Sequence, residues 1–301
     1  MIVVAKKYGQ LGNRLFLSAH LMAAGIEHGI DVANPCFAEY ANLFPATSRD
    51  LWCRLSRQHS QTDSADDRIP SLRQRRRLSW AVANLAKLGK LIGLRHWPAH
   101  LLQIDNDETY DLASADFAAL VQSGRHVLVR GWLYRSEPLL QKHADRIRQF
   151  YEIAPQHREA VDTTMKACRQ DADVVIGIHL RQGDYKTFLG GRYYYTNDQY
   201  ADVMRVARDQ LSGKRVSFLV CGNGQFSASD FGDLNVHVGP GHMVEDMYAL
   251  AETDALIGPP STFTGWASFY GRTPLISLQQ ANQAFDLNQV LDASGDQNPS
   301  P

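Results

Sequence analysis

Short apolar runs alternate with longer segments of helical period along much of the chain, and this alternation limits the possible folds more than any other feature. Each run is short and continuously apolar, which is typical of a buried strand. The six runs cover residues 2–6, 127–129, 174–179, 216–220, 255–257 and 274–276. Strands that alternate with helices predict an α/β fold with parallel sheets covered on both faces.

Helical period is clearest in residues 11–28, 199–211 and 243–251. Residues 136–153 also predict a helix, and Pro155 is placed to begin the next one. Single hydrophobic cores stop growing at about 250–300 residues, so a chain of 301 residues favours two lobes. The sequence therefore predicts one lobe at residues 1–153 and a second at residues 154–301.

The balance of charge gives no general attraction to nucleic acid, because 31 Lys and Arg residues stand against 32 Asp and Glu residues, for a net charge of −1. The cysteines at positions 36, 53, 168 and 221 lie too far apart for a C-x-x-C motif, and we expect reduced thiols. The N-terminal apolar run is too short for a signal peptide, and no stretch approaches the roughly 20 apolar residues of a spanning helix. These features predict a cytoplasmic protein without a nucleic-acid partner.

A basic segment interrupts the alternation, where residues 45–100 predict loops and one extra helix. Residues 68–100 contain eight Lys or Arg residues and no Asp or Glu. Residues 78–94 have helical period, with the apolar side chains of residues 78, 82, 85, 88 and 92 on one face and Lys87 and Lys90 opposite. Such a helix either packs against the core with a solvated basic face, or lies on an anionic membrane or an acidic partner.

The first motif that could bind a ligand covers residues 9–16 and directly follows the first predicted strand. Its glycines suit the turn from strand to helix, where free N–H groups and the helix dipole favour an anion. Gly12, Asn13 and Arg14 are the candidate ligand-binding residues. The spacing differs from the dinucleotide-binding pattern, and a tight capped turn is the alternative.

The second motif covers residues 176–185, where a buried strand leads into polar residues. Alternation along the strand directs His179 and Arg181 the same way, at the carboxyl end where α/β sheets bind ligands. Arg suits bidentate phosphate recognition, and His can donate a hydrogen bond or titrate near neutrality. Asp184 can orient Arg181 or act as a base. The alternative is a structural cluster that holds a loop.

The third motif covers residues 257–266, where two prolines end a strand and Ser261 is placed as a helix N-cap. The hydroxyls of Ser261, Thr262 and Thr264 lie beside free backbone N–H groups, as in a phosphate cradle without a lysine. The alternative is a capped helix with no further role. Together with the second motif, it would form a diphosphate clamp.

The ordered set of motifs resembles the α-1,2-fucosyltransferase family and its relatives, the nodulation and protein O-fucosyltransferases. Residues 9–16 are similar to the family's G-G-x-G-N-Q-x-F, and residues 179–185 to its H-x-R-R-G-D-Y. Residues 261–266 are similar to its S-[ST]-F-S-W-W. Residues 131–137 and 245–257 resemble two further segments of the family, in the same order.

The resemblance implies a glycosyltransferase of the GT-B type, with two Rossmann-like lobes and GDP-fucose as donor, without an obligatory metal or other cofactor. The first lobe would lie on the acceptor side, and the second would bind the nucleotide sugar. Arg181 would contact the diphosphate with support from His179, and Asp246 would hold the guanine or the ribose. The remaining donor-binding residues would be Gly12, Asn13 and Arg14 from the first lobe, and Ser261, Thr262, Phe263 and Thr264 from the second.

The implied reaction is inverting transfer of fucose to a hydroxyl of a glycan or lipid-linked glycan, with an α-1,2 linkage. Arg181, His179 and Asp184 are the candidate catalytic residues, and residues 68–97 are a candidate peripheral contact with the inner membrane face. The family's second Arg is Gln182 here, and its final Trp pair is Gly265 and Trp266. A catalytically silent binder, a transferase for another nucleotide sugar, and an unrelated phosphate-binding hydrolase or synthase are alternatives.

Overall fold

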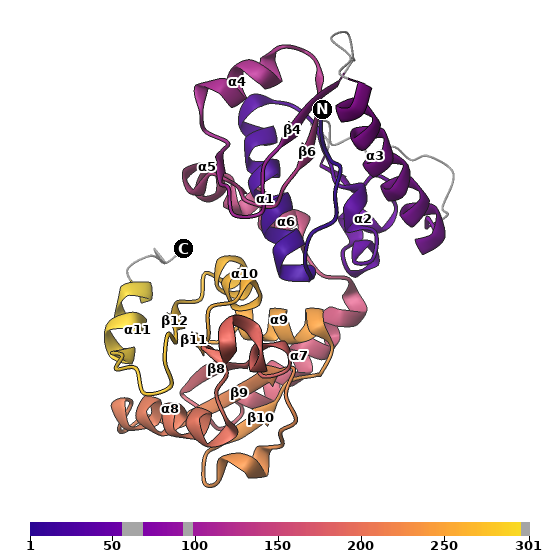
Figure 1. The fold of residues 1–301 in the computed structure, drawn as a ribbon. Coiled ribbons are helices and arrows are strands. Elements are labelled where there is room, and N and C mark those ends of the chain that lie inside the picture. The colour runs from indigo at the N-terminus through magenta and orange to yellow at the C-terminus, as the bar shows by residue number, and fades with distance from the viewer. Residues whose placement is uncertain (56–68, 93–98, 296–301) are drawn as a thin grey trace. The chain divides into compact units, whose positions relative to one another are not determined.

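The computed structural model describes residues 1–55, 69–92 and 99–295. It divides into two compact units, Met1–Ala154 and Pro155–Pro301, each with its own sheet (Figure 1). The division falls one residue after the one expected from the sequence, immediately before Pro155. This proline begins α7 (Pro155–Arg169), as its fixed φ angle favours.

The first unit contains a five-stranded sheet in the order β3-β2-β1-β6-β4. Its strands are β1 (Ile2–Val4), β2 (Val32–Ala33), β3 (Arg54–Leu55), β4 (Ala99–Gln103) and β6 (His126–Arg130). All neighbours pair in parallel except β2 and β3, which are antiparallel. A separate parallel pair joins β5 (Tyr110–Asp111) to β7 (Tyr134–Arg135). The short strands β2, β3, β4, β5 and β7 were not expected from the sequence.

Helices cover both faces of this sheet, with α1 on one side and α3 on the other (Figure 1). The helices are α1 (Leu11–His28), α2 (Pro45–Ser48), α3 (Leu72–Ile92), α4 (Ala115–Gln122), α5 (Glu137–Lys142) and α6 (Ala144–Phe150), with short 3₁₀ helices at Pro35–Phe37 and Ala41–Leu43. The single helix expected at residues 136–153 is wrong, because α5 and α6 meet at the non-helical His143. The ring of His143 lies 2.7 Å from a carboxylate oxygen of Glu27 on α1, which fixes the break.

The apolar face expected for the basic helix is only partly correct. Val82 is buried in a cluster with Val3 and Leu128 of the sheet. Leu85 and Leu88, however, are 46% and 47% exposed. The helix is therefore rotated relative to the face expected from its leucines. Residues 68 and 93–97 of the predicted basic insertion lie outside the described residues.

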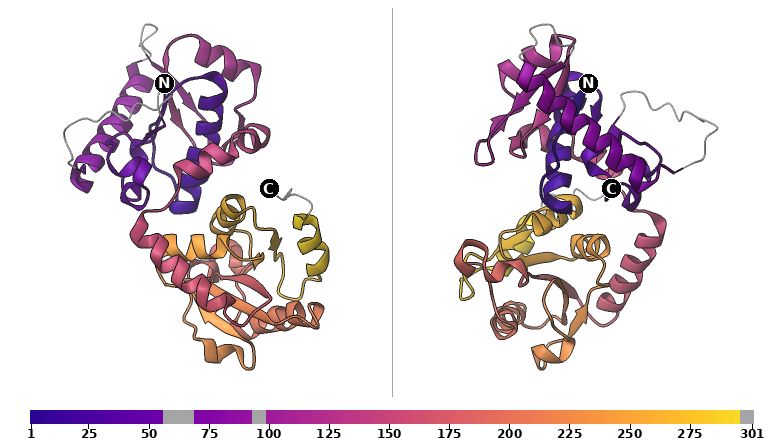
Figure 2. Two further views of the ribbon diagram at one scale, coloured as in Figure 1. Left: turned by 180° about the vertical axis from the view of Figure 1, so that it is seen from behind. Right: turned by 45° about the vertical axis from the view of Figure 1, so that its right-hand side comes forward.

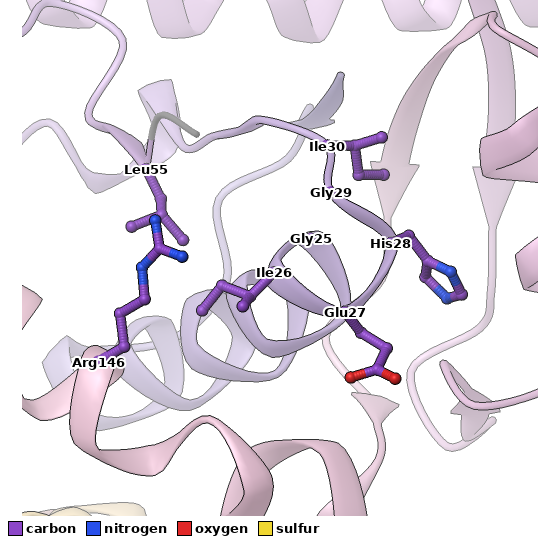
Figure 3. A pocket seen from close by; sticks show the side chains of 8 residues that line it. All are labelled: Gly25, Ile26, Glu27, His28, Gly29, Ile30, Leu55 and Arg146. Carbon is purple, nitrogen blue, oxygen red and sulfur yellow. The ribbon is translucent and has the colours of Figure 1, made fainter. Parts of the chain in front are cut away.

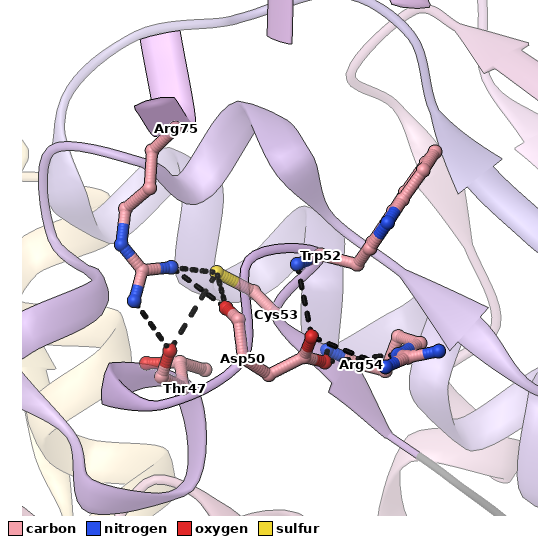
Figure 4. A network of polar contacts seen from close by, with 6 residues as sticks. All are labelled: Thr47, Asp50, Trp52, Cys53, Arg54 and Arg75. Atoms are coloured by element: carbon pink, nitrogen blue, oxygen red, sulfur yellow. Dashed lines mark hydrogen bonds and ion pairs between the residues drawn. The ribbon is translucent and has the colours of Figure 1, made fainter. Parts of the chain in front are cut away.

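A buried arginine explains this rotation (Figure 4). Arg75 is 1% exposed, and its guanidinium donates hydrogen bonds to the carbonyl oxygens of Thr47, Ser48 and Asp50. It also lies 3.4 Å from Sγ of Cys53. Because a buried guanidinium needs such partners, Arg75 must face the loop from Thr47 to Cys53. One of the eight basic residues of this segment is thus part of the core and not of the surface.

The second unit contains an all-parallel sheet in the order β10-β9-β8-β11-β12. The strands are β8 (Val174–Leu180), β9 (Val216–Gly222), β10 (Val236–Val238), β11 (Ala255–Gly258) and β12 (Leu275–Ser277). The helices after α7 are α8 (Asn197–Gln210), α9 (Met243–Ala251), α10 (Thr262–Gly271) and α11 (Leu287–Gly295), with 3₁₀ helices at Asp184–Lys186, Phe188–Gly191 and Ala228–Phe231. The predicted α/β alternation is confirmed.

A large apolar cluster joins β8, β9 and β11 to α8 on one face, while α7, α9 and α10 lie together on the other (Figure 2). Helix α11 continues to Gly295, and residues 296–301 lie outside the described residues. All four cysteines are buried free thiols, as predicted. Among the described helices, none combines the length and the apolar character that crossing a bilayer requires.

In both sheets the order of the strands reverses at the strand that comes first in the chain. From β1 the chain continues to β2 on one side and later returns to β6 on the other, and β8 has the same relation to β9 and β11. In open α/β sheets, ligands bind outside the carboxyl ends of the strands at such a switch point. The topology therefore marks two places, beyond β1 and β6 and beyond β8 and β11.

Candidate functional site

His179 lies near the carboxyl end of β8 and is almost completely buried, at 2% exposure. Its ring stacks on Phe263 of α10 with centroids 4.8 Å apart, and its Nδ1 has no hydrogen-bond partner. Burial, together with the charge of Arg181, lowers the pKa of His179 to about 3. The imidazole is therefore neutral at physiological pH, and titration near neutrality, one of the two roles considered for it, does not occur.

Arg181 follows the end of β8 and is held by its neighbours. Its Nη2 lies 2.9 Å from Oδ2 of Asp184, and its guanidinium lies over the ring of Tyr185, 5.2 Å from the centroid. The Nε atom is buried and has no hydrogen-bond partner. Burial by itself raises the pKa of Asp184, but the hydrogen bond and charge of Arg181 lower it overall. Asp184 is thus an ionised carboxylate that orients the arginine.

The loop after β8 is fixed by a network of amide groups. Asn223, which follows β9, accepts hydrogen bonds through Oδ1 from the backbone N–H groups of Gln182 and Gly183. The side chain of Gln182 donates to the carbonyl oxygen of Tyr195 and to Oδ1 of Asn197. Gln182 therefore holds the loop in place. Asn223 was not expected from the sequence, because only the pairing of β8 with β9 brings it to this loop.

The end of β11 lies against His179. A Cβ atom on Gly258 would be 2.9 Å from Cβ of His179, so only glycine allows this approach. The hydroxyl of Tyr185 donates to the carbonyl oxygen of Pro260 at 2.6 Å and joins the two loops. The second and third motifs thus form one site, as the sequence predicted they could.

Ser261 is the N-cap of α10, as predicted, and its Oγ accepts a hydrogen bond from the N–H of Phe263 at 3.1 Å. Thr262 is half-buried on the first turn. Thr264, which we expected to line the phosphates, is 0% exposed, and its hydroxyl donates to the carbonyl oxygen of Ser261. The helical turn directs this hydroxyl back onto the backbone, so the structure places Thr264 in the core.

Asp246 on α9 is 7% exposed, and its Oδ1 accepts a hydrogen bond from the N–H of Gly241 at 2.8 Å. Burial raises the pKa of Asp246 to about 6, although the Gly241 hydrogen bond acts in the opposite direction. A Cβ atom on Gly239 would lie 2.4 Å from Sγ of Cys221 and 2.8 Å from Oδ1 of Asp246. The loop at residues 239–242 therefore wraps this carboxyl. Its Gly-Pro-Gly sequence was the available signal.

In the first unit, the predicted motif forms the start of α1. Arg14 is 7% exposed, and its guanidinium donates to the carbonyl oxygens of Gly9 and Cys36 and to Glu39 at 2.7 Å. Gly12 is buried, and Asn13 is half-buried with Nδ2 close to Gly9. The contacts of Arg14 are those of a residue that shapes the turn.

Among the described residues, His157, His242 and Glu245 could offer three ligand atoms to a metal, all within 4.8 Å of one another. Nδ1 of His157 lies 2.7 Å from Glu245, and the two imidazoles stack with planes 16° apart. Near-parallel rings direct their lone pairs side by side and not toward a common point. The arrangement fits a hydrogen-bonded cluster beside Asp246.

A cavity of about 340 Å³ lies at the carboxyl end of α1 (Figure 3). It is lined by residues 25–30, Leu55 and Arg146. Its only acidic side chain, Glu27, is engaged by Lys142 and His143. Because α1 ends where the chain enters β2, this cavity lies near the amino ends of the strands, where α/β sheets do not usually bind ligands.

No protein-family model and no curated protein sequence matches the chain. Solved structures do match its fold. Arabidopsis thaliana FUT1 in complex with GDP is similar with a TM-score of 0.57 and 15% identity, over 91% of this chain and 69% of that one. Fucosyltransferase NodZ from Bradyrhizobium is similar with a TM-score of 0.53 and 16% identity, over 94% and 96%. NodZ alpha-1,6-fucosyltransferase soaked with GDP-fucose is similar with a TM-score of 0.51 and 16% identity, over 94% of this chain and 97% of that one. The predicted fold class, two Rossmann-like units of the GT-B type, is confirmed.

Proposed function

We propose that the protein is an inverting glycosyltransferase that moves fucose from GDP-fucose to a glycan hydroxyl, with an α-1,2 linkage. The observation that carries the proposal is the pair His179 and Arg181 at the switch point of the second unit. Each has a buried nitrogen without a hydrogen-bond partner. Burying such groups is costly unless a ligand completes their hydrogen bonds. The fold shared with proteins solved with GDP and GDP-fucose supports this ligand.

In this proposal, Arg181 binds the diphosphate of the donor. The bond from the fucose anomeric carbon to the β-phosphate oxygen breaks as the acceptor oxygen attacks from the opposite face and loses its proton. Negative charge then grows on the diphosphate, so donors held in place by the protein are strongest in the transition state. Asp184 acts as a positioning residue for Arg181, while Ser261 and Thr262 place the N-terminus of α10 near the phosphates. These groups supply the positive potential without an obligatory metal.

Asp246 is proposed to recognise the guanine. Guanine presents adjacent N–H donors at N1 and N2, which a carboxylate can accept together. The ribose hydroxyls are the second possible partner. In either case the ionised carboxyl is the stronger acceptor, so binding depends on its protonation.

The acceptor is proposed to be a glycan or lipid-linked glycan, with a peripheral membrane contact through α3. Arg73, Arg77 and the exposed Leu88 share the outer side of this helix. Sedimentation with phosphatidylglycerol vesicles at low salt tests the contact. Arg73→Glu together with Arg77→Glu should abolish it, and failure of the wild-type protein to sediment would contradict it. Arg75 is left unchanged because it is buried.

Thermal melting with nucleotides tests the nucleotide assignment. GDP that binds only the folded state at a hundred times its Kd adds about 2.7 kcal/mol of stability. We expect GDP and GDP-fucose to raise the Tm and UDP-galactose to leave it unchanged. The rise should be the same in EDTA as in magnesium. GDP-mannose tests the alternative sugar, and release of GDP from GDP-fucose separates an enzyme from a silent binder. A Tm unchanged by millimolar GDP would contradict the proposal.

A further inference from the structure

The switch point of the first unit also borders a cavity, of about 420 Å³. It lies at the ends of β1 and β6 and against α3, and its size is within the range of small-molecule sites. The residues that line it are Ala5, Lys6, Lys7, Ala38, Glu39, Arg76, Ser79, Trp80, Ala83, Lys87 and Arg130. Every one belongs to the first unit, so the cavity is complete without the second.

Positive charge dominates this cavity, because five lining residues are Lys or Arg and one, Glu39, is acidic. The carboxylate of Glu39 is already paired, at 2.7 Å from both Nζ of Lys7 and Nη1 of the buried Arg14. Burial by itself raises the pKa of Glu39, but the hydrogen bonds and charges of Lys7 and Arg14 lower it to about 2. Arg76 also pairs with Glu39, at 3.5 Å, so Glu39 engages Lys7 and Arg76 and leaves Lys6, Lys87 and Arg130 as the lining cations that can attract an anion.

Arg130 and Trp80 give the cavity groups that suit a sugar acid. Arg130 ends β6, and its Nε is buried without a hydrogen-bond partner. Trp80 is 72% exposed, the largest exposure among the large apolar side chains noted in the described part of the chain. Because Trp80 also lines the cavity, its ring offers a ligand there an accessible apolar surface. An indole can stack on the apolar C–H face of a pyranose ring, while a planar guanidinium pairs with a carboxylate or phosphate.

We propose that this cavity is the acceptor subsite for an anionic saccharide, one that carries a carboxylate or phosphate group. The proposal rests on the proposed function, because it names the acceptor class of the same transfer. Lys6, Lys87 and Arg130 bind the anionic group, and Trp80 stacks on the ring that carries it. The saccharide is favoured over a flat membrane surface because Arg130, the last residue of β6, lines a cavity and has a buried Nε.

Direct titration of the whole protein tests this without requiring turnover. Trigalacturonate is the carboxylated probe, mannose 6-phosphate the phosphorylated probe, and maltotriose the neutral one. We expect at least one anionic probe to bind at least about tenfold more tightly than maltotriose, and to weaken as salt rises. Whichever anionic probe binds identifies the group.

Two variants locate the binding. Trp80→Ala changes an exposed side chain, so the fold is retained, and Arg130→Gln removes the charge at the strand end. Each substitution should weaken binding of the anionic probe by about tenfold, while GDP still raises the Tm. Lys142→Gln, at a surface lysine paired with Glu27, and Leu85→Ala, at an exposed apolar residue of α3, are matched controls because neither residue lines the cavity, and they should have no effect.

The outcomes separate this inference from the proposed function. A GDP response with no preference for the anionic probes would overturn the subsite and leave the transferase proposal standing. Equal binding by wild type and Trp80→Ala would also overturn it. If Arg130→Gln weakened binding to phosphatidylglycerol vesicles but not to the saccharides, the cavity would be a membrane contact instead. If GDP did not raise the Tm, the proposed function itself would be contradicted.

Discussion

The two units share the arrangement of their central strands but present different side chains at the switch point. In the second unit, His179 is buried and Arg181 is held by Asp184 and Tyr185. In the first unit, Lys6 and Trp80 are exposed around an open cavity. The sheet therefore determines where a site forms, and the residues after the strands determine its ligand. An arginine held by an ion pair and a ring suits one fixed diphosphate, whereas exposed cations around a cavity suit acceptors of varied shape.

The largest effect should come from Arg181→Lys, which keeps the charge but removes the planar fork. We expect turnover of GDP-fucose to fall about a hundredfold or more, with an unchanged Tm. Arg130→Lys in the first unit should reduce turnover by only a few-fold, since Lys6 and Lys87 also bind the anionic group there. Equal losses in the two variants would remove the contrast between the sites. Arg215→Lys, at a surface pair with Asp173, is the control.

Arg75→Gln should destabilise the first unit by about 2–4 kcal/mol, because three backbone carbonyl groups lose their donor. Arg77→Gln, at an exposed position on the same helix, should change stability by no more than about 0.5 kcal/mol. Urea unfolding followed by tryptophan fluorescence gives both values. If the two variants were equally stable, α3 would not be anchored as described.

Asp246→Asn should weaken GDP binding by about tenfold at pH 8, because an amide cannot accept from both guanine N–H groups. Since the pKa of Asp246 is raised to about 6, GDP affinity of the wild type should rise as pH increases through that value. The ionised carboxyl is also unfavourable in the folded state above that pH, so the variant should not melt at a lower temperature at pH 8. Calorimetry from pH 5 to 8 checks the affinity. A pH-independent wild type would contradict the role of Asp246.

One buried histidine in each unit gives a further comparison. Burial, then nearby charge, lowers the pKa of His20 to about 4 and that of His179 to about 3. The contribution of each neutral histidine to the stability of the fold is fully present above pH 6.5, the pKa in the unfolded chain. It is lost as the pH falls toward the lowered pKa of the folded protein. Each contributes a slope of up to about 1.4 kcal/mol per pH unit between those limits. Urea unfolding at pH 7.5 and 5 should show a smaller pH dependence in His20→Asn and His179→Asn, and an unchanged slope would contradict the shifts.

Much of the fold could be predicted from the sequence because its signals are local. Strands β8 and β11 and helices α1 and α9 followed from apolar runs and helical period, and Ser261 was recognisable as an N-cap. The second and third motifs also met at one switch point. Chain order and the carboxyl ends of parallel strands were enough to bring them together.

Other features depended on contacts between distant residues, which no local pattern contains. Arg75 resembled its basic neighbours in the sequence, and only the loop from Thr47 to Cys53 made it a core residue. Burial decided that His179 is neutral, because desolvation penalises a charge regardless of residue type. The cavity around Arg130 exists because β1, β6 and α3 converge there from three separate parts of the chain. The sequence by itself determined the elements and the order of the motifs, and the tertiary structure decided which of their charges are buried and which remain available to a ligand.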